Sequence, residues 1–127
     1  MEIQNNLAII AGATFGMLAV IFGAFGAHAL KKRMTVDLLA SFETGVRYQM
    51  YHALLLCIMS ILPLGEWSNL SVNLIVIGVI LFSFSIYSLC LSATFGKKIK
   101  LLGPITPVGG LFLVAGWFIL LYSFFVK

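Results

Sequence analysis

The chain has 127 residues, of which 61% are hydrophobic and only 9% are charged, and its formal net charge is +4. Soluble domains carry roughly 25% charged residues, so this composition excludes a water-soluble fold with one enclosed core. The length predicts a single domain over residues 1–127.

Four long stretches contain no Asp, Glu, Lys or Arg: Ile3–Leu30, Tyr48–Gly65, Trp67–Gly96 and Leu101–Val126. A helix needs about 20 apolar residues to cross a hydrocarbon core about 30 Å thick. The sequence therefore predicts an all-α fold, a four-helix transmembrane bundle with a short amphipathic interfacial helix between helices one and two. The predicted spans are residues 7–30, 45–64, 69–94 and 107–126.

The basic residues gather at two of the three connections. Seven of the eight flank the first connection or fill the third: Lys31, Lys32, Arg33, Arg47, Lys97, Lys98 and Lys100. Basic residues beside membrane helices stay in the cytoplasm during insertion. We therefore expect a multi-pass protein of the plasma (inner) membrane, with loops one and three in the cytoplasm and both termini outside. We also expect contact with anionic lipid headgroups and no nucleic-acid partner.

The first span carries small residues at spacings of three or four, namely Gly12, Gly16, Ala19 and Gly23. Such a stripe lets another backbone approach closely in lipid. We favour packing within the chain, and self-association through Gly12 and Gly16 is the alternative. Residues 27–29 have the form of a signal-cleavage site, but the positive N-terminal region of a signal peptide is missing, so we expect the span to be retained.

The amphipathic helix is predicted over residues 35–46. One arc of it is apolar and consists of Met34, Leu38, Leu39, Phe42 and Val46. Thr35 is the expected N-cap, and Asp37 in the first turn suits the helix dipole. We expect this helix to lie in the cytoplasmic interface and to bend at Gly45 into helix two.

A polar cluster is predicted where helix one ends and helix two begins. Its candidate members are His28, Glu43, Arg47, Tyr48, Gln49, Tyr51 and His52. Glu43 and Arg47 are spaced for an ion pair on one helix face. We favour a structural clamp whose side chains bond one another and the loop backbone, because unpaired polar groups in lipid are costly. A ligand or headgroup pocket is the alternative. Two histidines are few for a zinc site, so we expect no metal and no cofactor.

The third span places hydroxyl groups on two faces, where they can bond neighbouring helices or carbonyls one turn earlier. These faces carry Ser83, Tyr87 and Cys90 on one side and Ser85, Ser88 and Ser92 on the other. Cys57 and Cys90 are expected at different depths in the membrane, which argues against a disulfide between them.

The start of the fourth span is rich in glycine and proline: Gly103, Pro104, Thr106, Pro107, Gly109 and Gly110. Thr106 is the expected N-cap and Pro107 the first helical residue. We favour a stiff turn followed by small residues for close packing. A broken segment that lines a cavity, as in transporters, is the alternative.

Three segments together resemble one known family. They are Gly23–Leu30 (GAFGAHAL), Phe42–Leu54 (FETGVRYQMYHAL) and Leu102–Gly110 (LGPITPVGG). In this order they are similar to domain of unknown function 423, a family of small bacterial membrane proteins, and the likeness covers nearly the whole chain. The resemblance implies four membrane helices, a plasma-membrane location and a role in membrane integrity or homeostasis. It implies no particular molecular activity.

The residues offer little for catalysis, since the chain has no Ser-His-Asp order, no phosphate-binding glycine loop and no acidic pair within the spans. We therefore expect a non-enzymatic protein that acts through association with lipids, with a second copy or with another membrane protein. The alternative is an oligomeric channel or transporter component for a small solute, although the missing intramembrane carboxylate weakens ion coupling. A third hypothesis is an enzyme or redox protein centred on His28 and His52.

Overall fold

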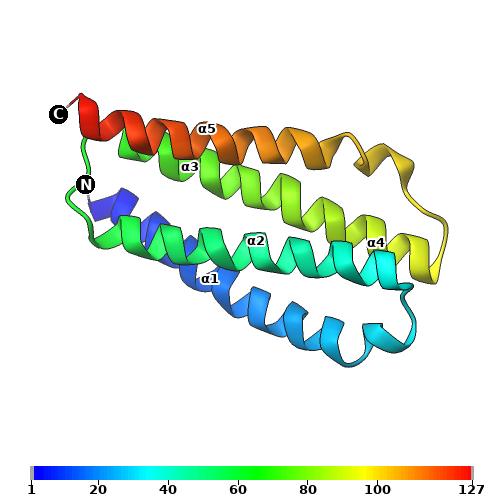
Figure 1. The fold of residues 1–127 in the computed structure, drawn as a ribbon. Helices are drawn as coiled ribbons and strands as arrows, with labels where there is room; N and C mark the ends of the chain where they lie inside the picture. Colours follow the sequence, from blue (N-terminus) through cyan, green and yellow to red (C-terminus); the bar gives the residue numbers. More distant parts are fainter. Residues whose placement is uncertain (1, 127) are drawn as a thin grey trace.

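The computed structural model describes residues 2–126, which fold into a bundle of long helices (Figure 1). Helix α1 covers Glu2–Ala27 and is followed by a 3-10 turn, η1, at Leu30–Lys32. Helix α2 covers Val36–Ile61. The third rod joins α3 (Ser68–Val79), the π-helical segment η2 (Ile80–Phe84) and α4 (Ser85–Phe95). A second 3-10 turn, η3 (Lys100–Leu102), leads to α5 (Ile105–Phe125). The predicted all-α four-helix bundle is confirmed.

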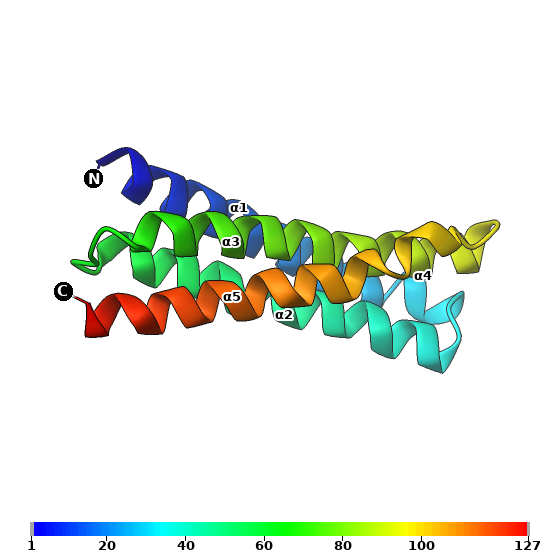
Figure 2. The ribbon, with the colours of Figure 1, turned by 90° about the horizontal axis from the view of Figure 1, so that it is seen from above.

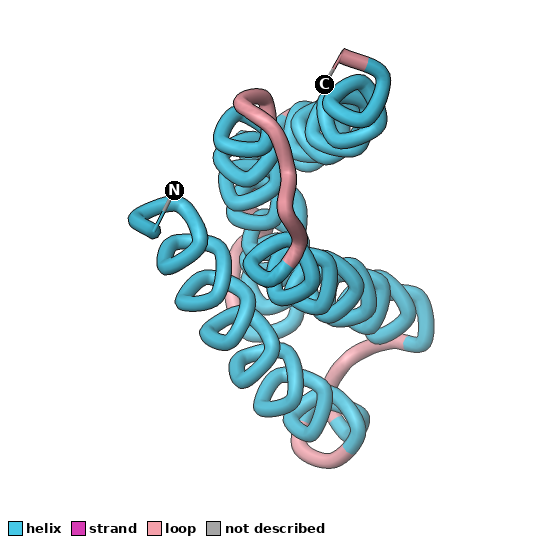
Figure 3. Tube along the Cα trace, turned by 90° about the vertical axis from the view of Figure 1, so that its left-hand side faces the viewer, coloured by secondary structure: helices cyan, strands magenta, loops and turns pink. Residues whose placement is uncertain are grey.

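The helices run alternately up and down the bundle. Both chain ends and the α2–α3 connection lie at one end, and the connections after α1 and α4 lie at the other (Figures 1 and 2). Seen along the bundle, α1 and α5 lie on the outside with α2 and the α3–α4 rod between them (Figure 3). Helix α1 packs chiefly against α2, and α5 chiefly against α3 and η2.

Three of the helical rods are long and apolar enough to cross a membrane by length and composition: Asn6–Lys32, Ser68–Phe95 and Lys100–Phe125. Helix α2 is the polar one of the four. Helix α2 lies between other helices, because it contacts both α1 and the α3–α4 rod. This position accommodates its polar side chains. Its side chains Gln49 and His52 are buried inside the bundle rather than facing the surroundings.

The predicted interfacial helix is not a separate element, and this part of the prediction is corrected. Thr35 does cap the segment, since its side-chain oxygen accepts the backbone N–H of Leu38 at 3.2 Å. Helix α2 then continues without a break through Gly45 to Ile61. The apolar arc of residues 34–46 packs into the bundle, where Met34 and Phe42 are buried. These apolar side chains pack against other helices of the bundle. They therefore do not form the predicted interfacial face.

The start of α5 also differs from the prediction. The helix begins at Ile105, with Pro104 as its N-cap residue and no side chain capping it. Thr106 is therefore inside the first turn, and its hydroxyl lies 2.6 Å from Oγ of Ser85 on α4. The Thr106 hydroxyl, which the sequence predicted to cap the helix, contacts a neighbouring helix instead.

Glycines set the distance between the rods at their closest approaches. A Cβ on Gly12 would lie 2.8 Å from the carbonyl oxygen of Ala53, so α1 meets the backbone of α2 there. Two further glycines of the stripe face α2 as well, because a Cβ on Gly16 would contact Ala53 and one on Gly23 would contact Val46. Near the start of α5, a Cβ on Gly109 would overlap the backbone of η2, where it would lie 2.7 Å from the carbonyl carbon of Leu81.

Candidate functional site

A layer of buried polar side chains lies between two apolar clusters of the bundle core. Gln49 of α2 is fully buried and makes two hydrogen bonds to other helices. Its Nε2 donates to the carbonyl oxygen of Phe15 on α1 at 2.8 Å, and its Oε1 accepts the hydroxyl of Tyr87 on α4 at 2.7 Å. One side chain thus ties three helices together at a depth where an unpaired amide would be costly.

Tyr87 is held for this bond by aromatic and glycine contacts. Its ring centroid lies 5.0 Å from that of Phe22 and 4.9 Å from that of Phe42. Gly45 makes room for the ring, because a Cβ on Gly45 would be 2.9 Å from Cε1 of Tyr87. Gly45 therefore serves a close approach between α2 and α4 rather than the predicted bend.

His52 lies one turn further along α2, and both of its ring nitrogens are used. Nε2 accepts the indole N–H of Trp117 on α5 at 3.0 Å. Nδ1 lies 2.6 Å from the carbonyl oxygen of Tyr48. Because the indole only donates and the carbonyl only accepts, the proton is on Nδ1 and the ring is the neutral tautomer. Metal or haem ligation through His52 would have to break one of these two bonds.

The serines of the α3–α4 rod are engaged inside the bundle. Ser83 donates to the carbonyl oxygen of Gly45 at 2.8 Å, and Ser71 donates to that of Gly116 at 2.7 Å. Both acceptors are glycines at close helix approaches. Ser88 and Ser92 donate to carbonyls of their own helix. The hydroxyls of Ser71 and Ser83 therefore serve helix association, whereas those of Ser88 and Ser92 are satisfied locally.

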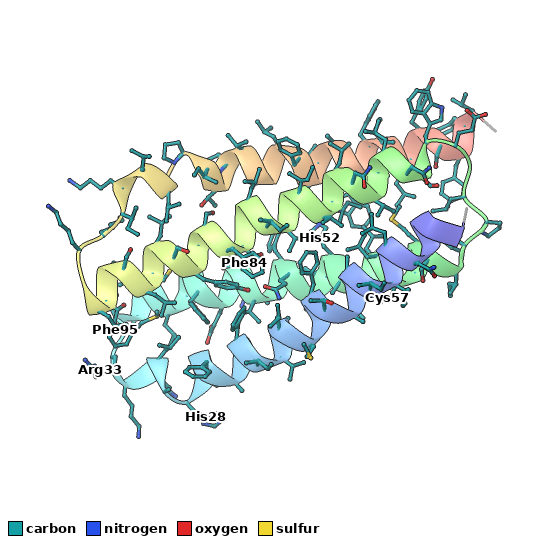
Figure 4. All side chains as sticks on the ribbon, turned by 180° about the vertical axis from the view of Figure 1, so that it is seen from behind. His28, Arg33, His52, Cys57, Phe84 and Phe95 are labelled. Atoms are coloured by element: carbon teal, nitrogen blue, oxygen red, sulfur yellow. The ribbon has the colours of Figure 1, made fainter. Side chains whose placement is uncertain are left out.

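The structure brings only part of the predicted polar cluster together. Gln49 and His52 are buried in the layer just described, and the ring of Tyr48 stacks 6.2 Å from that of His52. Tyr51 is exposed, and its ring lies 6.1 Å from that of Tyr48. His28 is exposed at the end of α1, remote from His52 in the middle of the bundle (Figure 4).

The predicted Glu43–Arg47 ion pair is not present in the described residues. Both side chains are exposed on α2, and Arg47 donates instead to Oγ1 of Thr44 at 3.1 Å. At this exposed position an ion pair would contribute little, so a nearby hydroxyl is an adequate partner. Neither residue belongs to the buried polar layer.

The other predicted features lie apart from this layer. Gly12, Gly16, Ala19 and Gly23 lie on α1, and the three glycines among them face α2 of the same chain, so this surface is not free for a second copy. Cys57 and Cys90 are both free thiols. Among the side chains of residues 6–126 there is no group of three or more His, Cys, Asp or Glu placed to hold a metal ion.

Sequence reasoning missed Trp117 as the partner of His52. The residue lies in an otherwise apolar helix, and the sequence shows no periodic signal that links it to α2. The available signal was chemical. An indole N–H in lipid needs a hydrogen-bond acceptor, and His52 is one of the few side chains that can accept. Tyr87 was noted only as part of a hydroxyl face, not as the partner of Gln49.

The fold and the long apolar rods define the class of this protein, which is a small helical membrane protein. The chain belongs to the family described as "Protein of unknown function (DUF423)", whose family model matches residues 22–110. The resemblance seen in the sequence is confirmed.

Three similar proteins are each named UPF0382 membrane protein. One from Staphylococcus haemolyticus is 41% identical over 94% of this chain and 96% of its own length. One from Staphylococcus aureus shows the same identity and coverage. Another, from Schizosaccharomyces pombe, is 40% identical over 83% of this chain and 90% of its own length, so the family extends beyond bacteria. No solved structure matches the chain.

Proposed function

We propose that this protein resides in the plasma membrane with its basic end in the cytoplasm, and that it acts without catalysis by associating with anionic lipids and membrane partners. One observation carries the proposal. The connections after α1 and α4 lie at the same end of the bundle, and they bring Lys31, Lys32 and Arg33 together with Lys97, Lys98 and Lys100 (Figure 1). The other end offers only Glu66 in its connection.

Charge supports the cytoplasmic orientation of that end. Lys and Arg beside membrane helices favour the cytoplasmic side, and each one near an anionic leaflet contributes roughly 1 kcal/mol of attraction. Six such residues at one end therefore form a surface suited to anionic headgroups. A role in membrane integrity or homeostasis would follow from such lipid contact.

The hydrogen bonding of the polar side chains inside the bundle supports a non-enzymatic role. Gln49, His52 and Tyr87 are the polar groups best placed for chemistry, and all three are engaged in hydrogen bonds between or within helices. A group used in this way is not presented to a substrate. The serines of the α3–α4 rod are hydrogen-bonded too, so we do not extend the proposal to a channel or transporter.

The orientation is tested by labelling single introduced cysteines with a membrane-impermeant maleimide in intact cells. Gly65→Cys lies in the α2–α3 connection, where an added Cβ meets open space. We expect it to react in intact cells, whereas Lys98→Cys should react only after permeabilisation. The wild-type chain, with Cys57 and Cys90, measures the background. The reverse labelling pattern would refute the orientation.

The association is tested by the lipids and proteins that co-purify after mild detergent extraction. We expect anionic phospholipid to be enriched over its share in the source membrane, or a membrane partner to be present in fixed proportion. A monomer with the lipid composition of the source membrane and no partner would refute the proposal.

A further inference from the structure

An apolar groove lies on the side of the bundle near its basic end. It has a volume of about 450 Å³, within the range of about 300 to 1,000 Å³ of small-molecule sites. Its base includes Leu30 and Phe42, which are buried. One wall is formed by Ile21 and Phe25 of α1, which are 45% and 56% exposed. The groove is therefore a recess that opens toward the lipid.

The far side of the groove is apolar, and one end of the groove carries a cation. Leu91 and Phe95 of α4 line the far side, and Arg33 lines the end nearest the loops. The guanidinium carbon of Arg33 lies 5.0 Å from the centroid of the Phe95 ring, a distance typical of a cation–π contact. Figure 4 shows the two residues together at that end of the bundle.

Arg33 is not paired with an acidic side chain. It is exposed, and among residues 6–126 the structure gives it no carboxylate partner. The nearest acidic residue in sequence is Asp37, in the first turn of α2. The α1 wall ends in Lys31 and Lys32, and the α4 wall is followed in sequence by Lys97 and Lys98. Cationic residues thus follow both walls of the groove.

The groove fits within the depth of half a bilayer. The α1 residues that line it extend from Ile21 to Phe25, which is about 6 Å at a rise of 1.5 Å per residue, and Ala29 and Leu30 continue the lining beyond the end of the helix. One leaflet of a hydrocarbon core about 30 Å thick is about 15 Å deep. An occupant with a chain in the groove would thus have its polar end at the level of Arg33.

We propose that the α1–α4 groove binds one acyl chain of an anionic phospholipid of the inner leaflet, with the lipid phosphate at Arg33. Arg is well suited to this role, because its planar guanidinium can bond two phosphate oxygens while one face rests on an aromatic ring. The apolar walls admit the chain, and the cations select the headgroup. This inference rests on the proposed orientation and names the lipid site within the proposed association.

The test is native mass spectrometry of the full chain in detergent, titrated with dioleoyl phosphatidylglycerol or dioleoyl phosphatidylcholine. These lipids have the same chains and differ in headgroup charge. We expect one phosphatidylglycerol to be retained in preference to phosphatidylcholine. Arg33→Gln should lower that preference about fivefold, the equivalent of roughly 1 kcal/mol for one cation near an anionic surface. Lys97→Gln, at the same end but outside the lining, should lower it less.

A second pair of variants tests the apolar part. Ala29→Phe places a ring in the groove, and Ala24→Phe places the same ring on α1 outside the groove, at a position that is also exposed. We expect Ala29→Phe to abolish the retained lipid and Ala24→Phe to keep it. Unchanged elution and helix content show that each variant is folded.

The outcomes separate this inference from the proposed function. A wild-type chain without preference for phosphatidylglycerol overturns the groove site. If the preference survives both Ala29→Phe and Arg33→Gln but is lost when the loop lysines are replaced, the groove is also refuted, while association with anionic lipid stands. Equal loss in Ala24→Phe and Ala29→Phe would likewise overturn a site in the groove.

Discussion

The indole nitrogen of Trp117 lies 3.0 Å from Nε2 of His52 and donates a hydrogen bond to it. Trp117 is on α5, which otherwise packs against α3 and η2, and His52 is on α2. This bond therefore connects the outer helix α5 with the polar centre of the bundle. Its removal should be measurable, because the buried His52 would keep a ring nitrogen without a partner.

We predict that Trp117→Phe lowers the free energy of unfolding by about 1 kcal/mol, a value typical of hydrogen bonds between membrane helices. Chemical or thermal unfolding in detergent measures the change. Trp67→Phe is the matched control, because Trp67 makes a ring contact with Tyr122 and the structure gives its indole N–H no hydrogen bond. Equal losses in the two variants would show that indole size, not the bond, matters.

Gln49 and Tyr87 should behave as a coupled pair. Gln49→Leu removes the bonds to Phe15 and Tyr87, and we expect a loss of about 1–3 kcal/mol because the buried Tyr87 hydroxyl loses its acceptor. Adding Tyr87→Phe removes that orphaned hydroxyl. The double variant should therefore lose less than the sum of the two single variants, as neighbouring groups do. Strict additivity in unfolding measurements would contradict the bond.

Gly109 and Gly110 are adjacent but should respond in opposite ways to alanine. A Cβ on Gly109 would overlap the backbone nitrogen of Phe82 and lie 2.8 Å from its Cα, and backbone cannot move aside as a side chain can. We expect Gly109→Ala to destabilise the bundle by about 1–3 kcal/mol. A Cβ on Gly110 would lie 3.7 Å from the Phe82 ring, an ordinary contact.

Gly110→Ala should therefore be neutral or stabilising by up to about 1 kcal/mol, the difference in helix propensity between the two residues. Thermal unfolding of both variants in the same detergent measures the contrast. Equal tolerance of alanine at both positions would mean that α5 does not rest on η2 as described.

Gly12→Ala and Gly16→Ala test which surface the small residues of α1 serve. A Cβ on Gly12 would meet the carbonyl oxygen of Ala53 and the sulfur of Cys57, each at 2.8 Å, whereas a Cβ on Gly16 would lie 3.8 Å from that of Ala53. We expect Gly12→Ala to lower stability by about 1–3 kcal/mol, and Gly16→Ala to be tolerated.

The oligomeric state provides the second readout for the α1 variants. Light scattering should give the same molar mass for both variants and for the wild type. A change of oligomer size with unchanged stability would instead indicate that the small residues of α1 serve self-association.

Part of the polar layer could be anticipated from the sequence. The cost of unpaired polar groups in lipid was sufficient to predict that Gln49 and His52 would be bonded and structural in character. Their partners were out of reach, because Phe15, Tyr87 and Trp117 lie 34, 38 and 65 residues away from them along the chain. Local reasoning instead joined these residues to His28 and Arg47, which are exposed.

The sequence alone determined that this chain is a helical membrane protein of four rods, and it placed the basic residues at two connections. Length, hydropathy and charge suffice for these conclusions, since each depends only on how a local segment partitions between lipid and water. The tertiary structure alone decided that residues 36–46 form the first part of α2, that Thr106 bonds Ser85, and that a groove opens between α1 and α4. Those features depend on which distant side chains compete for the same burial or hydrogen bond, and no local pattern records that competition.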